Sequence, residues 1–206
     1  MPMLIDQLVL PRCPHCGVAR PVLGICNRVS TSAVIGSRTR VWAVYSCTTC
    51  GGAVTAEANN SAEVVAFYPP LPVADAAIPE RARACLQQAL ETRHAAMGCV
   101  MLCASAIDAM LKEKGLTKGN LFERIDKAAD DHVITKEMAR WAHNIRLDAN
   151  DQRHPDTAAP LPTVEDAKRC VEFALALAEF LFVLPARVTR GLSDSPEAGA
   201  NKPQTE

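Results

Sequence analysis

Two short cysteine motifs, Cys13-Pro14-His15-Cys16-Gly17 and Cys47-Thr48-Thr49-Cys50-Gly51, decide the fold of the amino-terminal part of this chain. Each motif holds two cysteines separated by two residues, so that one tight turn can direct two sulfur atoms at the same ion. Two such turns, thirty residues apart, complete a tetrahedral shell and leave no open position for a substrate or an activated water. The spacing therefore predicts a structural Zn²⁺ site whose ligands are Cys13, Cys16, Cys47 and Cys50.

The same spacing also fits four unligated thiols or two redox-active pairs, and ligand type and spacing favour zinc over both. A disulfide framework fits poorly, since the chain has nine cysteines, an odd number. His15 lies between two predicted ligands, and we expect its ring to point away from the ion. Cys99 and Cys103 share a helix face that Cys85 could approach, but buried thiols are common in cores and we expect no second metal site there.

Short apolar and β-branched runs on both sides of the motifs predict a small β unit. They cover residues 4–10, 22–29, 41–45, 53–58 and 63–68. Four prolines follow within residues 69–79, and they prevent a continuous helix or strand there. We therefore expect a zinc ribbon over residues 1–68 and a stiff linker over residues 69–79.

Helical periodicity begins at Glu80. The expected helices run from there to near Gly98, from about Cys99 to Lys114, from 121 to about 130, from Thr135 onward, and from 163 to about Leu184, where Pro185 stops the last one. Asn120, Thr135 and Thr163 are suitable amino-terminal caps, and Asp166 completes a capping box with Thr163. The sequence thus predicts an α+β protein, with an all-α bundle of about five helices over residues 80–185 and a disordered tail over residues 186–206.

The charge and hydropathy of the chain exclude several classes of protein. It has 22 basic and 23 acidic side chains and a net charge of -1, so any contact with nucleic acid would be local rather than a general electrostatic attraction. The most apolar late stretch, Val171 to Leu184, is interrupted by Glu172 and Glu179 and is too short to span a bilayer. The first residues lack the pattern of a signal peptide, so we expect a cytoplasmic protein with reduced thiols and no membrane partner.

A polar segment of the predicted fourth helix is the second candidate site. Arg146, Asn150 and His154 are spaced four apart, and a continued helix would align them on one strip that opens at Pro155. Arg can bind a phosphate with two donors, His can transfer a proton near neutral pH, and Asn can orient a base or a ribose hydroxyl. A helix end held by its own hydrogen bonds is the alternative interpretation, and residue types alone favour it.

Several further motifs accompany the cysteines. They are Tyr68-Pro69-Pro70, Lys112-Glu113-Lys114-Gly115, Gly119-Asn120-Leu121 with Ile125, and Arg146, Asn150 and His154 followed by Pro155. Together with the two CxxCG motifs, this pattern resembles the bacterial family known as domain of unknown function 4145. That family is similar to the HEPN superfamily of helical domains, many of which are dimeric, metal-independent ribonucleases of toxin–antitoxin and phage-defence systems. The resemblance implies a HEPN-like fold, a homodimer, and RNA or a defence protein as partner.

Two features depart from the superfamily's pattern. Its hallmark is an arginine, then four to six residues, then a histidine, whereas seven residues separate Arg146 from His154. The family it resembles often carries an arginine before an acidic residue on its second helix. Here Asp108 can take the acidic place, but Ala104-Ser105-Ala106 before it include no arginine.

These observations favour binding over catalysis. We expect a zinc-ribbon and HEPN-like module that binds nucleic acid or a partner protein in a bacterial defence or regulatory system. The alternative is a metal-independent endoribonuclease, in which Arg146 binds the scissile phosphate, Asn150 positions the substrate and His154 is general acid and base. A zinc-stabilised structural subunit without a ligand is a third option.

Overall fold

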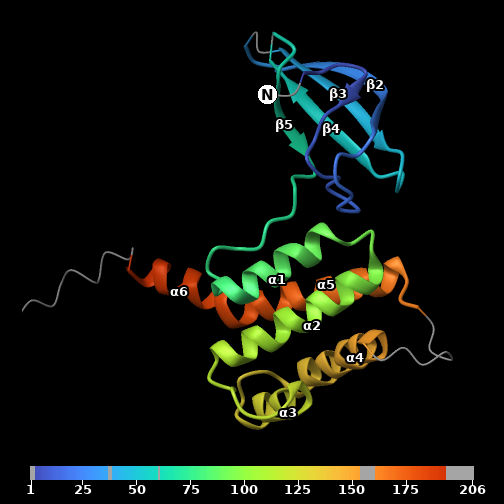
Figure 1. Ribbon diagram of the computed structural model, residues 1–206. Coiled ribbons are helices and arrows are strands. Elements are labelled where there is room, and N and C mark those ends of the chain that lie inside the picture. Colours follow the sequence, from blue (N-terminus) through green and yellow to red (C-terminus); the bar gives the residue numbers. More distant parts are fainter. Residues whose placement is uncertain (1–2, 37–38, 60, 154–160, 194–206) are drawn as a thin grey trace, which may run out of the picture. The chain divides into compact units, whose positions relative to one another are not determined.

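The chain folds as an antiparallel sheet followed by helices, which confirms the α+β class predicted from the sequence (Figure 1). The computed structural model describes residues 3–36, 39–59, 61–153 and 161–193, and of residues 146–153 it describes the backbone only. Internal contacts divide the chain into two compact units. The first consists of the residues up to Val73 together with Leu90–Ala96, and the second consists of the remaining described residues.

In the described residues, five strands form a curled sheet in which neighbours along the chain are neighbours in space (Figure 1). They are β1 (Gln7–Leu8), β2 (Leu23–Ser32), β3 (Thr39–Cys47), β4 (Ala53–Ala58) and β5 (Val64–Tyr68). Alternate residues of β3 are buried, following the two-residue period of a strand, and Tyr45 is fully buried among them. The Tyr45 hydroxyl donates a hydrogen bond to the Ile5 carbonyl at 2.8 Å, so this buried polar group is satisfied.

The strands β1, β2 and β3 differ most in length from the prediction, and β3 runs over Thr39–Cys47 rather than 41–45. β1 is only two residues long, because the chain leaves the sheet before Pro11, which has no N–H to donate, and enters the first cysteine turn. β2 continues to its polar end, since backbone pairing joins Ser32 to Thr39 of β3. The β2–β3 hairpin therefore extends beyond the apolar run that the sequence marks.

Six α-helices and one π-helical turn follow in the described part of the chain. They are α1 (Glu80–Glu91), α2 (Ala96–Glu113), α3 (Leu121–Asp130), α4 (Lys136–Arg153), α5 (Val164–Ala178), the π-helical turn η1 (Glu179–Val183) and α6 (Leu184–Ser193), the last three being continuous. The predicted caps are confirmed, because the side chains of Asn120, Thr135 and Thr163 each accept a hydrogen bond from a backbone N–H of the following turn. None of the helices among the described residues has both the length and the apolar character needed to cross a membrane.

Two predicted helix ends are wrong. α1 ends at Glu91 rather than near Gly98, because the chain turns where the Ala95 N–H donates to the Thr92 carbonyl at 2.7 Å. The last helix does not stop at Pro185 but continues to the end of α6, into the predicted tail. The Leu184 N–H donates to the Glu179 carbonyl five residues back, so the chain at Pro185 departs from the α pattern in which a proline ring clashes with the carbonyl four residues before it.

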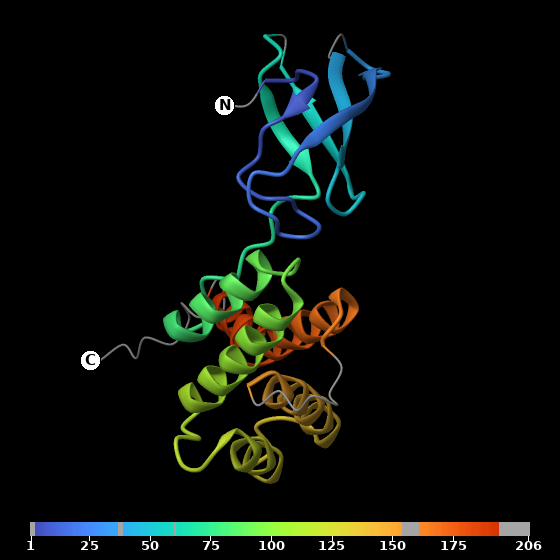
Figure 2. The same cartoon turned by 45° about the vertical axis from the view of Figure 1, so that its right-hand side comes forward.

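α2 packs between α1 and α5. Its Cys99 thiol donates to the Ala89 carbonyl of α1 at 3.3 Å and lies 3.9 Å from the Ala167 carbonyl of α5. Half of its residues are buried, including Val100, Ile107, Met110 and Leu111, as expected of a central helix. α3 and α4 lie side by side in both views (Figure 2), and the Phe122 ring packs on the His143 ring at 4.8 Å.

Candidate functional site

The structure brings together the four predicted metal ligands, Cys13, Cys16, Cys47 and Cys50. The first two lie on the turn between β1 and β2, and the other two lie at the end of β3 and on the turn to β4. The two turns are closed in the same way: the Gly17 N–H donates to the Cys13 carbonyl at 3.0 Å, and the Gly51 N–H donates to the Cys47 carbonyl at 2.7 Å. Both glycines have positive φ angles, 78° and 71°, which explains why glycine follows each CxxC pair.

The sulfur atoms have the spacing of a tetrahedral metal site. All four Sγ atoms lie within 4.8 Å of one another, and those of Cys13 and Cys50 are 3.9 Å apart. Zinc–sulfur bonds of about 2.3 Å at tetrahedral angles require sulfur atoms about 3.8 Å apart. A disulfide would bring them to about 2.05 Å, and every cysteine of the chain is a free thiol. The four cysteines are therefore close enough together to bind one metal ion.

The electrostatics of the cluster also suit a cation. Burial raises the pKa of Cys16 to about 12 and raises that of Cys50 as well. At Cys47 burial opposes ionisation, but backbone N–H groups of Cys50 and Thr49 donate to the sulfur and bring the pKa down to about 7. Because four thiolates this close repel one another, they need a bound cation to ionise together.

His15 is engaged away from the sulfur cluster. Its Nε2 donates a hydrogen bond to the Ala53 carbonyl at 2.7 Å, and its ring lies so close to Gly52 that a Cβ there would be 2.5 Å from it. Among the described residues, the four cysteines are the one group of three or more histidine, cysteine or acidic side chains close enough to hold an ion. The donor set is therefore four sulfur atoms.

The buried cysteines of the helices have a different character. Cys99, Cys103 and Cys170 are all buried. A hydrogen bond with Cys99 and burial both raise the pKa of Cys103. A thiol that stays protonated is a poor nucleophile and a poor ligand, so Cys103 packs as a small apolar side chain.

The polar segment of α4 is described only in part. α4 is continuous through Arg146 and Asn150, so their spacing of four is one helical turn. The side chains of both residues, and the whole of His154, lie outside the described residues. The grouping of these three side chains stays a prediction. Earlier in the segment Trp141 is a packing residue, with its ring 4.9 Å from that of Phe173.

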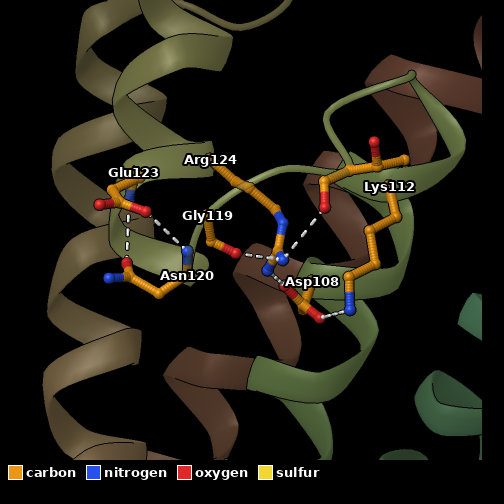
Figure 3. A network of polar contacts seen from close by, with 7 residues as sticks. Asp108, Lys112, Gly119, Asn120, Glu123 and Arg124 are labelled. Atoms are coloured by element: carbon orange, nitrogen blue, oxygen red, sulfur yellow. Dashed lines mark hydrogen bonds and ion pairs between the residues drawn. The ribbon is translucent and has the colours of Figure 1, made fainter.

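A polar network that the sequence did not predict joins α2 to α3 (Figure 3). Asp108 is bonded on both carboxylate oxygens: Oδ2 lies 2.6 Å from Lys112 Nζ and Oδ1 lies 2.5 Å from Arg124 Nη1. The other terminal nitrogen of Arg124 donates to the carbonyls of Gly119 and Thr117. Arg124 therefore ties the α2–α3 turn to α2, and its side chain is only 11% exposed.

Sequence reasoning identified Asp108 but missed Arg124. It looked for an arginine on the same helix, whereas the structure supplies one from α3. Two local signals were present, the i,i+4 spacing of Asp108 and Lys112 and the capping box that starts the helix of Arg124. Neither signal says that the two helices meet at this point.

Comparison with known families decides the membership of the chain. A family model described as a domain of unknown function (DUF4145) matches residues 80–195, more than half of the sequence. The chain belongs to the DUF4145 family. The DUF4145 match contains the Asp108 network and the polar segment of α4 but not the cysteine turns, so the metal centre stands on its geometry alone. Searches of curated proteins and of solved structures returned no significant match.

Proposed function

We propose that Cys13, Cys16, Cys47 and Cys50 bind one structural Zn²⁺, and that the chain is a non-catalytic nucleic-acid-binding module of a bacterial defence or regulatory system. In this proposal residues 1–68 are a zinc ribbon that contacts single-stranded RNA, residues 69–79 are a linker, and residues 80–185 are a HEPN-like helical domain that forms a homodimer. Four sulfur donors at tetrahedral spacing support zinc, and a closed shell supports a structural role.

An aromatic pair on the outer face of the sheet carries the nucleic-acid part of the proposal. The rings of Trp42 and Tyr68 lie 6.3 Å apart at 45°, and the side chain of Tyr68 is 52% exposed. Trp42 alternates with the buried residues of β3, so it belongs to the face opposite the core, as does Arg40. Unpaired bases stack on such rings, and an arginine beside them can contact the phosphates.

The charges of this face predict that the affinity for RNA depends only modestly on salt concentration. Arg40 is paired with Glu57, Nε to Oε1, at 3.4 Å, so the face has little excess positive charge. Stacking rather than counterion release would then supply most of the affinity. This agrees with the overall charge of -1.

A fluorescence titration tests the proposal. Trp42 and Trp141 are the two tryptophans of the chain, so a Trp141→Phe protein reports on Trp42 alone. We expect single-stranded RNA to quench this emission, and Tyr68→Ala to weaken binding about tenfold. Val65→Ala, an exposed position of the same strand without a ring, should leave affinity unchanged. Absence of quenching by the folded, zinc-loaded protein in low salt would refute RNA binding by this face.

The continuity of α4 through Arg146 and Asn150 favours a second candidate, a metal-independent endoribonuclease. His154 would take the proton of a ribose 2′-hydroxyl, whose oxygen attacks the adjacent phosphorus, and the imidazolium so formed would give this proton to the departing 5′-oxygen. Arg146 would stabilise the charge on the phosphate and Asn150 would orient the substrate. Cleavage in magnesium-free buffer by the parent, lost in His154→Ala, would support this candidate. Retained binding without cleavage by either protein would support the binding module.

A further inference from the structure

A cavity of about 300 Å³ lies among α1, α2 and α3, and the Asp108 network forms part of its wall (Figure 3). Its polar lining comes from Arg81 and Cys85 of α1, Ser105, Asp108 and Lys112 of α2, and Arg124 of α3. This volume is at the lower end of the range for small-molecule sites. It has room for one charged group and a few further atoms.

The charge in the cavity is strongly positive for its size. Three cations, Arg81, Lys112 and Arg124, line it against the single carboxylate of Asp108, which leaves two positive charges in excess. Arg81 is exposed and has no hydrogen bond or ion pair within the described ranges. Its five N–H donors are therefore available to a ligand.

Arg124 positions the carboxylate of Asp108 in the wall of the cavity. It bonds Asp108 from the buried side, so the carboxylate is balanced from within the helices. Lys112 contacts the same carboxylate from the open side, where its side chain is 46% exposed and keeps two of its three N–H donors. The buried Nε of Arg124 has no hydrogen-bond partner in the described structure.

We propose that this cavity binds the phosphate dianion of a small molecule. A phosphate monoester carries nearly two negative charges at pH 7, which balances the cavity, whereas a carboxylate would balance only half of the excess. The planar fork of Arg81 suits two phosphate oxygens, and the ammonium of Lys112 suits the third. The site is separate from the sulfur cluster and stands independently of nucleic-acid binding.

Protection of Cys85 provides the test, because its thiol lines the cavity and is partly exposed. Site-resolved mass spectrometry follows its alkylation by N-ethylmaleimide in the full chain, with the exposed Cys26 as internal reference. The probes are inorganic phosphate, glycerol 3-phosphate and acetate at equal ionic strength. We expect one or both phosphates to slow alkylation of Cys85 but not of Cys26, and acetate to have no effect. Comparison of the two phosphates tells free phosphate from a phosphomonoester as the preferred source.

Matched variants identify the contacts. Arg81→Ala and Lys112→Ala should each raise the half-protecting phosphate concentration about tenfold, the usual effect of losing a charged hydrogen bond. Arg83→Ala removes the same kind of side chain from the same helix outside the cavity lining and should change nothing. Circular dichroism checks that each variant is folded. The proposal is overturned if neither phosphate protects Cys85, if acetate protects equally, or if Arg83→Ala matches Arg81→Ala.

Discussion

Arg124 and Asp108 are sixteen residues apart on different helices, yet Nη1 of the arginine lies 2.5 Å from Oδ1 of the aspartate. Their side chains are 11% and 23% exposed, so water screens the pair only in part. The same arginine bonds the carbonyls of Gly119 and Thr117. The pair therefore fixes the conformation of the whole turn between α2 and α3.

Removal of the guanidinium should leave a half-buried carboxylate behind. We expect Arg124→Met to lower the free energy of unfolding by about 2 kcal/mol, less than for a fully buried pair because Asp108 keeps its contact with Lys112. Urea unfolding measures the change. The double variant Asp108→Leu, Arg124→Met should lose less than the single one, since no half-buried carboxylate remains and the Lys112 ammonium is exposed enough for water to solvate it. Equal losses in the two proteins would contradict this account.

Loss of one sulfur ligand should abolish metal binding. We expect Cys47→Ser to reduce bound zinc from one ion per chain to a small fraction, because an open shell of three thiolates binds far more weakly, and to unfold the sheet. Elemental analysis of the purified protein and circular dichroism measure the two effects. Cys26→Ser removes an exposed thiol outside the cluster and should retain both zinc and fold. A zinc content that Cys47→Ser leaves unchanged would show that the ion is bound elsewhere.

The capping box of α5 should make stability depend on pH. The Thr163 backbone N–H and hydroxyl donate to the Asp166 carboxylate and hold its pKa below the ordinary value. Such a carboxyl stabilises the fold above its unfolded pKa of about 4, and the contribution is lost as the pH falls through the lower folded pKa. Asp166→Ala should therefore cost about 1 kcal/mol at pH 7 and progressively less at acid pH, as the carboxyl becomes protonated in the folded protein.

Thermal unfolding of the parent and of Asp166→Ala across this range measures the effect. Glu165→Ala removes a carboxylate from the same turn that takes no part in the capping box, and it should change stability little at neutral or acid pH. A deficit of Asp166→Ala that stayed constant with pH would rule out the carboxylate as its source.

The contact between Gly52 and His15 should make the second cysteine turn sensitive to a single methyl group. A Cβ at residue 52 would lie 2.5 Å from the imidazole, so Gly52→Ala should displace the ring and break its 2.7 Å bond to the Ala53 carbonyl. A change in the chemical shift of the His15 ring resonances in an NMR spectrum would report the loss of this bond. His15→Ala in the same protein should restore most of the lost stability, because the steric conflict is gone. If the double variant is no more stable than Gly52→Ala alone, the conflict lies elsewhere.

The sequence predicted local features better than contacts between distant segments. The caps Asn120 and Thr163 follow from residue types a few positions apart, which act within one turn. The meeting of the two CxxC turns was predictable although they are distant in sequence, because one metal ion needs all four donors. The end of α1 was missed because residues 92–97 after Glu91 contain no glycine or proline that would mark the end of a helix. The Asp108–Arg124 pair was missed because only the packing of α2 on α3 brings its two side chains together.

The π-helical turn η1 sets the direction in which α6 presents its side chains. A π turn holds about one residue more per turn than an α-helix, so winding the same residues, Glu179–Val183, as α-helix would rotate α6 by about a quarter-turn around its axis. Leu184, Val188 and Leu192, four apart and exposed on one side, would then aim a quarter-turn away. Pro185 would also lie inside an uninterrupted α-helix, where its ring clashes with an earlier carbonyl. The π-helical turn therefore determines which side of the carboxyl-terminal helix these apolar residues occupy.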